Sequence, residues 1–404
     1  MNSSQYQLAH PAARTRGSVG PRRADRIDEL QNQIEQLKEK MRIAVIFGGD
    51  KTDDGAVINT TVNPRSWKSY EAVAHDIADA LKRIGFRHVQ VFPEDMRVGE
   101  RLRRNKIHMA WLNTGGVQGY ISMSHSAATL EMIGIPYVGH DPMTAGLLDS
   151  KHVFKRMLKA LDIPTANFMT WSLAQGPLQP ESNARFQQVF KDYPGPFVVK
   201  PVCGRASLNI HLVEDIAELP FVVSSVCRDT ENHVLIESFL PGREFCVAVC
   251  GPVICRQGKL ERLDTPFAFA TIERRLEQDE KIFVSMDLRP ITNKRVNLLD
   301  PDTEADVIRR LEKLAYQIFQ EVNLETLIRL DVRMDEHGEL YVLEANPKPD
   351  LKAPTEEKTS LVCTSLESCG LSYEDLILSL LADRLDLYLS QRRGSITRLA
   401  ELLR

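Results

Sequence analysis

The sequence lacks any hydrophobic stretch as long as the roughly 18 residues that a helix needs to cross a lipid bilayer. Its most apolar stretch, Phe245 to Ile254, is interrupted by Gly251 and Pro252. Neither sign of charge is in large excess, since 51 lysines and arginines face 55 aspartates and glutamates, for a net charge of -4. We therefore expect neither a membrane partner nor a nucleic-acid partner.

Paired cysteines are also lacking. None of the seven cysteines forms a Cys-x-x-Cys motif, and Cys246, Cys250 and Cys255 lie in an apolar, strand-like segment. This pattern predicts reduced, mostly buried cysteines in a cytoplasmic protein, with zinc binding as the alternative. The sequence also has no Gly-x-x-x-x-Gly-Lys loop, no Gly-x-Ser-x-Gly elbow and no His-Glu-x-x-His motif, so three common types of catalytic centre have no signature here.

The N-terminal 40 residues are unlike the rest of the chain. The first 24 contain four arginines, no acidic side chain and no apolar core of the kind that a secretory signal needs. We interpret residues 1–23 as a disordered arm, with an organelle transit peptide as the alternative. Ile27, Leu30, Ile34 and Leu37 then recur at helical spacing, which predicts an amphipathic helix that either forms a small dimerising coil or lies on its own domain.

A length of 404 residues predicts two to three domains, and 43% hydrophobic and 26% charged residues are ordinary for a globular protein. Alternating short strands and helices after Met41 predict a doubly wound α/β domain, followed by α+β segments. Residues 256–299 are charged and lack periodicity, which predicts a mobile loop at their centre. The expected division is 1–40 (arm and short helix), 41–149 (α/β domain), 150–240 (small α+β unit), 241–390 (second α+β unit) and 391–404 (helical tail).

The strongest chemical signal is a pair of motifs, Arg329-Leu-Asp331 and, twelve residues later, Glu344-Ala-Asn346. Residues two apart in a strand project from one face, and the turn at 335–338 would make the two strands antiparallel neighbours. Carboxylate and amide oxygens are ligands that Mg²⁺ accepts alongside water and nucleotide phosphates, and the guanidinium would neutralise a transferring phosphoryl group. The ordinary alternative is a solvated face of salt-bridged strands.

Two weaker sequence motifs favour a nucleotide-binding site. The strand Pro196-Phe-Val-Val-Lys200 delivers a lysine next to the small-residue loop Cys203-Gly204-Arg205-Ala206-Ser207. An ammonium, loop N–H groups and the Ser207 hydroxyl would suit phosphates, although many strands end in lysine. Glu237 ends a strand and Glu244 follows seven residues later. Contacts with adenine and ribose are one use for these carboxylates, and exposed acids near a turn are the ordinary explanation.

Taken in order, these motifs resemble the ATP-grasp superfamily, and more closely the D-alanine-D-alanine ligase family, over about residues 41 to 385. The resemblance implies an ATP-grasp fold with an N-terminal doubly wound α/β domain, a central lid subdomain at 150–240 and a catalytic subdomain at 241–390. Further matches are Phe47-Gly-Gly49, Asn113-Thr-Gly-Gly-Val-Gln-Gly119, Leu130-Glu-Met-Ile-Gly-Ile-Pro-Tyr-Val-Gly139, and Lys151 with Lys155.

The resemblance also implies roles for individual residues. Lys151 and Lys200 would contact ATP phosphates, Glu237 the adenine side and Glu244 the ribose. Two Mg²⁺ ions, with Mn²⁺ as a substitute, would be held by Asp331, Glu344 and Asn346. Arg329, Lys200 and Ser207 would act in catalysis, and Arg329 would stabilise the acyl-transfer intermediate.

The substrate end departs from the family. Val62 stands where the family has a glutamate for the first substrate's ammonium, unless Asp53 or Asp54 substitutes. Arg205-Ala206-Ser207 replaces Gly-Ser-Ser, and Pro349-Asp350-Leu351 replaces Pro-Gly-Met, whose glycine N–H helps to form an oxyanion hole. The remaining substrate-end candidates are Lys352 as a partner of Asp350, Thr355 in place of a serine that holds the second substrate's carboxylate, and Lys281 as the family's loop lysine.

We therefore expect a cytoplasmic, ADP-forming ligase that joins small carboxylate and amine substrates through an acyl phosphate, as a homodimer. Because of the altered pocket, we expect D-alanine alone to be a poor substrate. The alternatives are an inactive ATP-binding regulatory or scaffold protein, and a phosphotransferase or carboxylase on the same nucleotide frame.

Overall fold

The computed structural model describes residues 23–49, 70–119, 121–204, 207–277, 280–282, 292–355, 360–392 and 396–404. The predicted arm therefore lies almost wholly outside the described residues. Outside them, too, lie the substrate-end candidates Asp53, Asp54 and Val62 and the loop residues Arg205 and Ala206. Within the described part of the chain, no helix combines the length and the apolar character needed to cross a membrane.

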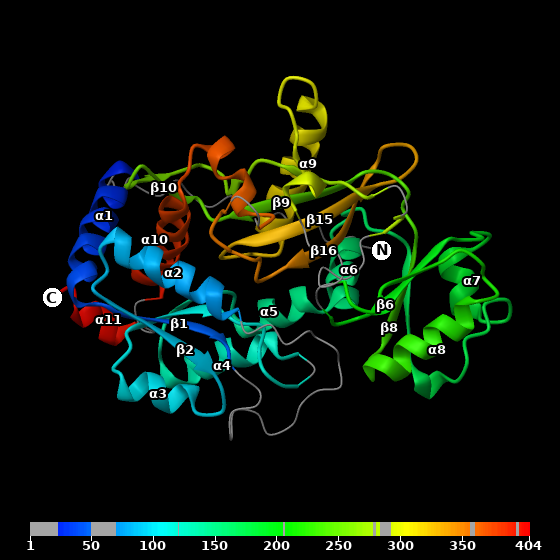
Figure 1. The fold of residues 1–404 in the computed structure, drawn as a ribbon, viewed down its shortest axis with the longest axis horizontal. Coiled ribbons are helices and arrows are strands. Elements are labelled where there is room, and N and C mark those ends of the chain that lie inside the picture. The colour runs from blue at the N-terminus through cyan, green and yellow to red at the C-terminus, as the bar shows by residue number, and fades with distance from the viewer. Residues whose placement is uncertain are drawn as a thin grey trace, which may run out of the picture.

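The N-terminal sheet is parallel, with strand order β2-β1-β3-β4 (Figure 1). Its strands are β1 (Arg42–Gly48), β2 (His88–Glu94), β3 (Met109–Asn113) and β4 (Tyr137–Val138). Helix α2 (Glu71–Ile84) shares a core with one face of β1, whereas α3 (Val98–Arg104) and α4 (Met123–Ile133) share a core with its other face. Helices on both faces explain why β1 is almost continuously apolar and buried.

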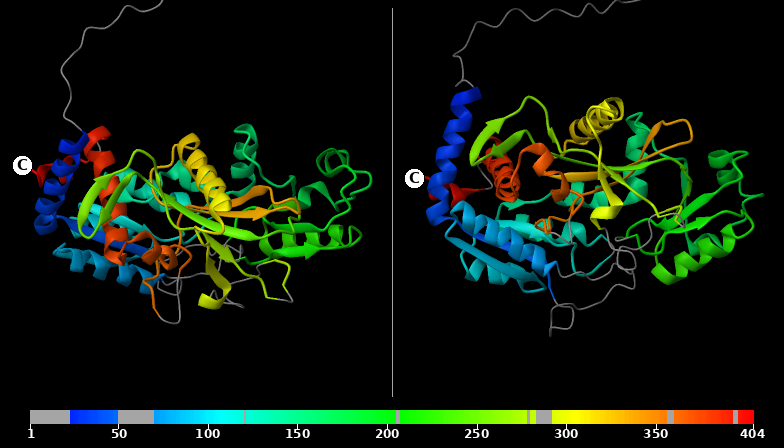
Figure 2. Two further views of the ribbon diagram at one scale, coloured as in Figure 1. Left: turned by 90° about the horizontal axis from the view of Figure 1, so that it is seen from above. Right: turned by 45° about the horizontal axis from the view of Figure 1, so that its top comes forward.

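The central sheet has strand order β5-β8-β6-β7, with antiparallel neighbours. Its strands are β5 (Phe168–Trp171), β6 (Phe197–Pro201), β7 (His211–Val213) and β8 (Val234–Ser238). One face packs on α7 (Ala184–Phe190) and α8 (Leu219–Thr230), which lie at one end of the molecule in Figure 1. Figure 2 shows this unit set apart from the N-terminal sheet, with the largest sheet between them.

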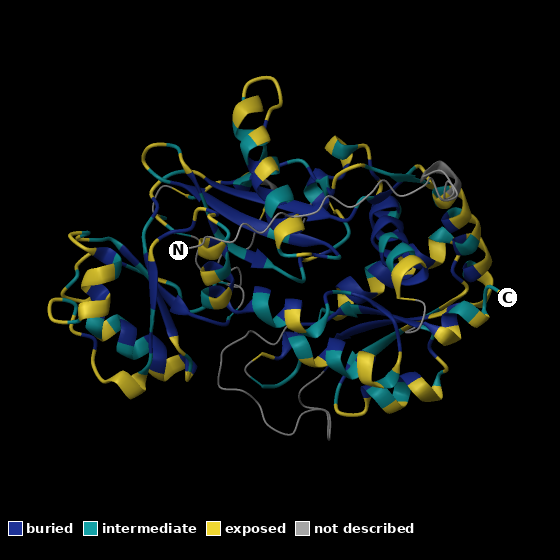
Figure 3. Cartoon of the chain, turned by 180° about the vertical axis from the view of Figure 1, so that it is seen from behind, coloured by how far each residue is buried: buried dark blue, intermediate teal, exposed yellow. Residues whose placement is uncertain are grey.

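The largest sheet has six strands, ordered β14-β13-β9-β15-β16 with β12 beside β9. They are β9 (Glu244–Cys250), β12 (Phe267–Ala268), β13 (Ile272–Arg274), β14 (Val296–Leu298), β15 (Ile328–Met334) and β16 (Leu340–Asn346). Helices α6 (Lys151–Ala160) and α9 (Ala305–Glu321) contribute to the core on this sheet, with the end of α5 (Pro142–Asp149). The strands are the buried interior seen in Figure 3, and the outer faces of the helices are exposed.

The C-terminal helices return to the N-terminal sheet. Helix α10 (Tyr373–Gln391) begins with a capping box between Ser372 and Asp375 and buries most of its length. It packs against α2, β4 and the hairpin formed by β10 (Val253–Arg256) and β11 (Lys259–Arg262). A short helix, α11 (Thr397–Glu401), follows. One hydrophobic core is thus shared by the first and last parts of the chain.

The structure also bears on two predictions made from the sequence, one for residues 256–299 and one for the cysteines. The mobile loop predicted at the centre of residues 256–299 falls mostly on residues 278, 279 and 283–291, which lie outside the described residues, and the described flanks contain the short strands β11 to β14. These strands escape sequence reasoning because each has only two to four residues and is held by its neighbours in the sheet. The cysteine prediction is confirmed: all seven are free, and six are buried.

The predicted amphipathic helix is α1 (Arg23–Lys40), and its apolar side faces its own chain. Leu30, Ile34 and Leu37 are at most 3% exposed within the core that also contains α2 and α10. Of the two alternatives, the helix therefore lies on its own domain rather than offering this seam to a partner. The homodimer itself stays a prediction.

Because α1 is part of the core, we expect two N-terminal truncations to differ in stability. We expect removal of residues 1–22 to leave stability and activity close to those of the full chain. Removal of residues 1–40 uncovers the core beneath Leu30, Ile34 and Leu37, and losing each buried leucine or isoleucine side chain costs about 1.5–3 kcal/mol. Thermal unfolding of both proteins measures the difference. Equal melting temperatures would contradict a core role for α1.

Candidate active site

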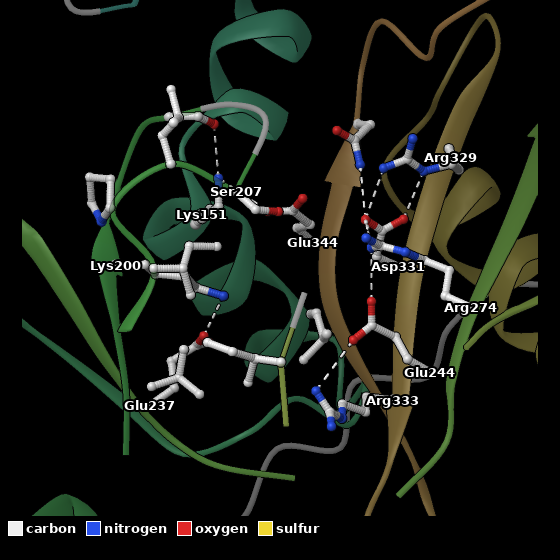
Figure 4. Close-up of a pocket in the computed structure, with 18 of the residues that line it drawn as sticks. Lys151, Lys200, Ser207, Glu237, Glu244, Arg274, Arg329, Asp331, Arg333 and Glu344 are labelled. Atoms are coloured by element: carbon white, nitrogen blue, oxygen red, sulfur yellow. Dashed lines mark hydrogen bonds and ion pairs between the residues drawn. The ribbon is translucent and has the colours of Figure 1, made fainter. Parts of the chain in front are cut away.

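A pocket opens between the central sheet and the largest sheet, and most predicted site residues line it. Figure 4 shows its two walls: Lys200 and Glu237 on one, and Arg329, Asp331 and Glu244 on the other. The predicted residues in its lining are Lys151, Lys200, Ser207, Glu237, Glu244, Arg329, Asp331, Glu344, Asn346 and Asp350. Segments far apart in the chain, from Tyr70 to Leu361, thus contribute to one cavity.

Glu237 lies at the centre of the wall formed by β6 and β8, where it bridges two lysines. Its carboxylate is 2.6 Å from Nζ of Lys155 and 2.5 Å from Nζ of Lys200. All three side chains are buried, and the Lys155 ammonium also donates to Thr165 Oγ1. Burial opposes ionisation of Glu237, but Lys155 and Lys200 outweigh it and lower its pKa. The cluster therefore holds the Lys200 ammonium in place at the pocket surface.

The opposite wall is the predicted pair of antiparallel strands. Arg329 pairs with Asn346 and Asp331 pairs with Glu344 across β15 and β16, with a bulge just after Asp331. The Arg329 guanidinium binds the Asp331 carboxylate through two hydrogen bonds of 2.8 and 2.9 Å. Asn346 Nδ2 lies 3.4 Å from the same carboxylate. The period-two spacing thus places all four side chains on the face that lines the pocket.

Lys151, at the start of α6, connects the two walls. Its ammonium lies 3.1 Å from Glu344 Oε2 and donates to the carbonyl of Gly204, which belongs to the loop after β6. Burial disfavours the Glu344 carboxylate, but Lys151 and then Lys200 outweigh this and lower its pKa to about 2. Glu344 is therefore an anion at any pH at which the protein would work.

Two arginines that the sequence did not single out complete the polar lining. Arg274 on β13 lies 2.9 Å from one oxygen of Glu244 and 4.0 Å from Asp331, and Arg333 on β15 lies 3.4 Å from the other oxygen of Glu244. Burial raises the pKa of Glu244 although both guanidinium groups oppose it. The sequence could have predicted that Arg333 lines the pocket, because it follows Arg329 and Asp331 at a spacing of two residues in the same strand. Arg274 could not be predicted in this way, since β13 was not recognised.

Three substrate-end candidates lie elsewhere. Lys352 forms an ion pair of 2.6 Å with Asp76 of α2, and its side chain is not the partner of Asp350; only its backbone N–H donates to Asp350. Lys281 forms an ion pair with Glu214 at the surface. Neither lysine, nor Thr355, is among the described residues that line the pocket. Asp350 does line it, from an exposed position.

The donor set of the second wall is chemically suited to Mg²⁺. Asp331, Glu344 and Asn346 offer oxygen atoms from adjacent positions of two paired strands. No group of three or more histidine, cysteine, aspartate or glutamate side chains gathers as a metal site among the described residues. A metal here would therefore take its other ligands from water or phosphates, as Mg²⁺ commonly does.

Comparison with known proteins shows the family to which the chain belongs. The family described as "D-ala D-ala ligase C-terminus" matches residues 157–382, more than half of the chain. The chain belongs to the D-alanine-D-alanine ligase family. A D-alanine--D-alanine ligase of Gloeobacter violaceus is 26% identical over 86% of this chain and all of its own length. An uncharacterized protein of Sinorhizobium fredii, y4sG, is 27% identical over 66% of this chain and 71% of its own.

Solved structures show the same fold. The D-alanine--D-alanine ligase from Bacillus anthracis, determined as a complex with ATP, aligns with a TM-score of 0.62 at 19% identity, covering 88% of this chain and 99% of that one. The D-alanyl-alanine synthetase A from Vibrio cholerae aligns with a TM-score of 0.60 at 18% identity, covering 86% and 99%. The D-alanine-D-alanine ligase-like chain thus has the ATP-grasp fold and is an ATP-dependent, ADP-forming ligase.

Proposed function

We propose that this ligase forms an amide or peptide bond between a small carboxylate substrate and a small amine substrate through an acyl phosphate. The observation that supports this most is the convergence of Lys151, Lys200 and Arg329 with Asp331 and Glu344 in one buried pocket. Lys151 and Lys200 would bind phosphate oxygens, and the two carboxylates with Asn346 would hold Mg²⁺. That ion would neutralise phosphate charge when bound.

The reaction has two steps. A substrate carboxylate oxygen attacks the γ-phosphorus of ATP, so that a new O–P bond forms and ADP leaves. The amine nitrogen then attacks the acyl carbon, loses a proton, and inorganic phosphate leaves with the C–O bond electrons. Lys151 and Lys200 orient the phosphates, and Arg329 stabilises negative charge that develops on the acyl carbon's oxygen. We propose that Ser207, which lines the pocket with Lys151 and Lys200, contacts the same phosphates.

The proposed nucleotide contacts come from both walls of the pocket. The adenine would lie along the chain after Glu237, where Ser238, Phe239 and Leu240 line the pocket, because the Glu237 carboxylate is already shared by two lysines. Glu244, between Arg274 and Arg333, is our proposed ribose contact. We also propose that residues 150–240 act as a lid over this site, because they contain the central sheet, which forms one wall of the pocket.

Hydroxylamine trapping tests the proposed chemistry. With ATP, Mg²⁺ and an acid substrate, we expect the enzyme to convert hydroxylamine to a hydroxamate, because an activated acyl group reacts with any good nucleophile. The measurement is hydroxamate and ADP formed across a panel of acids, each with and without amines. ADP without hydroxamate would indicate phosphotransferase chemistry, and ATP binding without ADP from any pair would indicate a regulatory protein.

The identity of the substrates is a separate proposal. The pocket lining carries Asp350 at the position where the resemblance to the family implies a glycine, and a carboxylate near a developing oxyanion would oppose the family's usual chemistry unless it contacts a cation. We propose that D-alanine alone is a poor substrate and that Asp350 receives an ammonium of the amine partner. The same panel, with D-alanine as one member, measures this: efficient D-alanyl-D-alanine formation would refute it.

A further inference from the structure

Tyr70 and Lys348 form a side of the pocket that the nucleotide assignment does not use. The Lys348 ammonium lies 3.4 Å from the centre of the Tyr70 ring, and both residues line the pocket. Tyr70 directly precedes α2, and Lys348 follows the end of β16 by two residues. The N-terminal domain and the catalytic sheet therefore meet at this side of the pocket.

The meeting of these two elements is fixed by hydrogen bonds outside the pocket. Asp76 of α2 accepts a hydrogen bond of 2.6 Å from the Lys352 ammonium and one of 3.1 Å from the backbone N–H of Ala353. The loop that carries Lys348 is thereby tied to the helix that Tyr70 begins. The ammonium and the ring are thus held together by contacts that do not depend on a ligand.

Tyr70 itself adopts an uncommon backbone conformation. Its φ of 54° and ψ of 19° lie in the left-handed region, which costs a residue with a side chain free energy. The side chain of Asn113, 2% exposed at the end of β3, donates a 3.0 Å hydrogen bond to the Tyr70 carbonyl. This hydrogen bond helps to hold the backbone of Tyr70, and with it the ring, at the edge of the pocket.

A cation over an aromatic ring is held in position by its attraction to the ring face. We propose that Lys348, positioned by Tyr70, binds a substrate carboxylate that does not react. This inference rests on the proposed ligase function and deepens it. The carboxylate belongs either to the amine substrate or to a dicarboxylic acid substrate, and both present the same group to the ammonium.

Two kinds of comparison decide which substrate carries the bound carboxylate: substrates with and without a carboxylate that does not react, and variants of Lys348 and Tyr70. ADP release is measured with acetate or succinate as the acid, and with propylamine or alanine as the amine. We expect Lys348→Met to raise the KM of the carboxylate-bearing substrate roughly tenfold to hundredfold, as expected for loss of a charge-assisted hydrogen bond. The kcat and the KM for ATP should change little. Lys348→Arg should restore most of the affinity, and Tyr70→Leu should weaken it.

The matched control is Lys82→Met, which removes a lysine from the exposed face of α2; it should behave like the unaltered enzyme. Unchanged KM values for every substrate in Lys348→Met would overturn the inference, and so would a raised KM for ATP alone, since Lys348 would then contact phosphate. If no pair yields ADP, the proposed function fails instead. Titration of succinate and alanine into both proteins then decides the inference: weaker binding to Lys348→Met supports it, and equal binding refutes it.

Discussion

Replacing Glu344 with glutamine is expected to lower ADP formation by about a thousandfold, because loss of this proposed anionic metal ligand would remove several kcal/mol of transition-state stabilisation. The carboxylate lies 3.1 Å from Lys151 and is ionised, with a pKa of about 2. Glutamine has the same shape, and so the fold should be kept. The measurement is the rate of ADP release at saturating ATP and Mg²⁺, with circular dichroism to check folding.

Glu339→Gln is the matched control for this variant. Glu339 directly precedes the same strand, is 67% exposed and pairs with Arg310 outside the pocket. We expect its activity to equal that of the unaltered protein. ADP release near the normal rate in a folded Glu344→Gln protein would remove Glu344 from the active site and leave the metal to other ligands.

Replacing Glu237 with leucine is expected to destabilise the protein by about 3–5 kcal/mol, the usual cost of removing one partner of a buried ion pair. In this case two buried ammonium groups, those of Lys155 and Lys200, lose their shared carboxylate. The measurement is the denaturant midpoint at neutral pH. Because the lysines lower the pKa of Glu237, its contribution is present above the unfolded pKa and is lost as the pH falls through the folded value.

The control is a lysine–glutamate pair at the surface. Glu214→Leu removes the partner of Lys281, and both of these side chains are more than half exposed. Such pairs contribute about 0–1 kcal/mol, so the midpoint should hardly move. A Glu237→Leu protein as stable as the Glu214→Leu protein would show that Lys155 and Lys200 do not depend on Glu237. Adding Lys155→Met to Glu237→Leu should recover part of the loss, since one uncompensated charge is removed.

The sequence by itself determined the wall formed by β15 and β16. Only five residues, 335–339, join these strands, and residues two apart in a strand share a face. The positions of Arg329, Asp331, Glu344 and Asn346 therefore follow from local geometry. Sequence reasoning also predicted the α/β domain of alternating strands and helices that follows Met41, the amphipathic helix that is α1, and buried, unpaired cysteines. The place of Lys200 at the end of β6 was also predicted, although its partner was not.

Only the tertiary structure decided which charges meet and which apolar faces are covered. The pairing of Glu237 with Lys155 spans 82 positions of the chain, and that of Lys352 with Asp76 spans 276. Arg274 reaches Glu244 only because a three-residue strand pairs with β9. The apolar side of α1 was open to two interpretations until the core beneath it was seen. Periodicity identifies a face that must be buried, but the partner is selected by packing between segments distant in sequence, which no local pattern encodes.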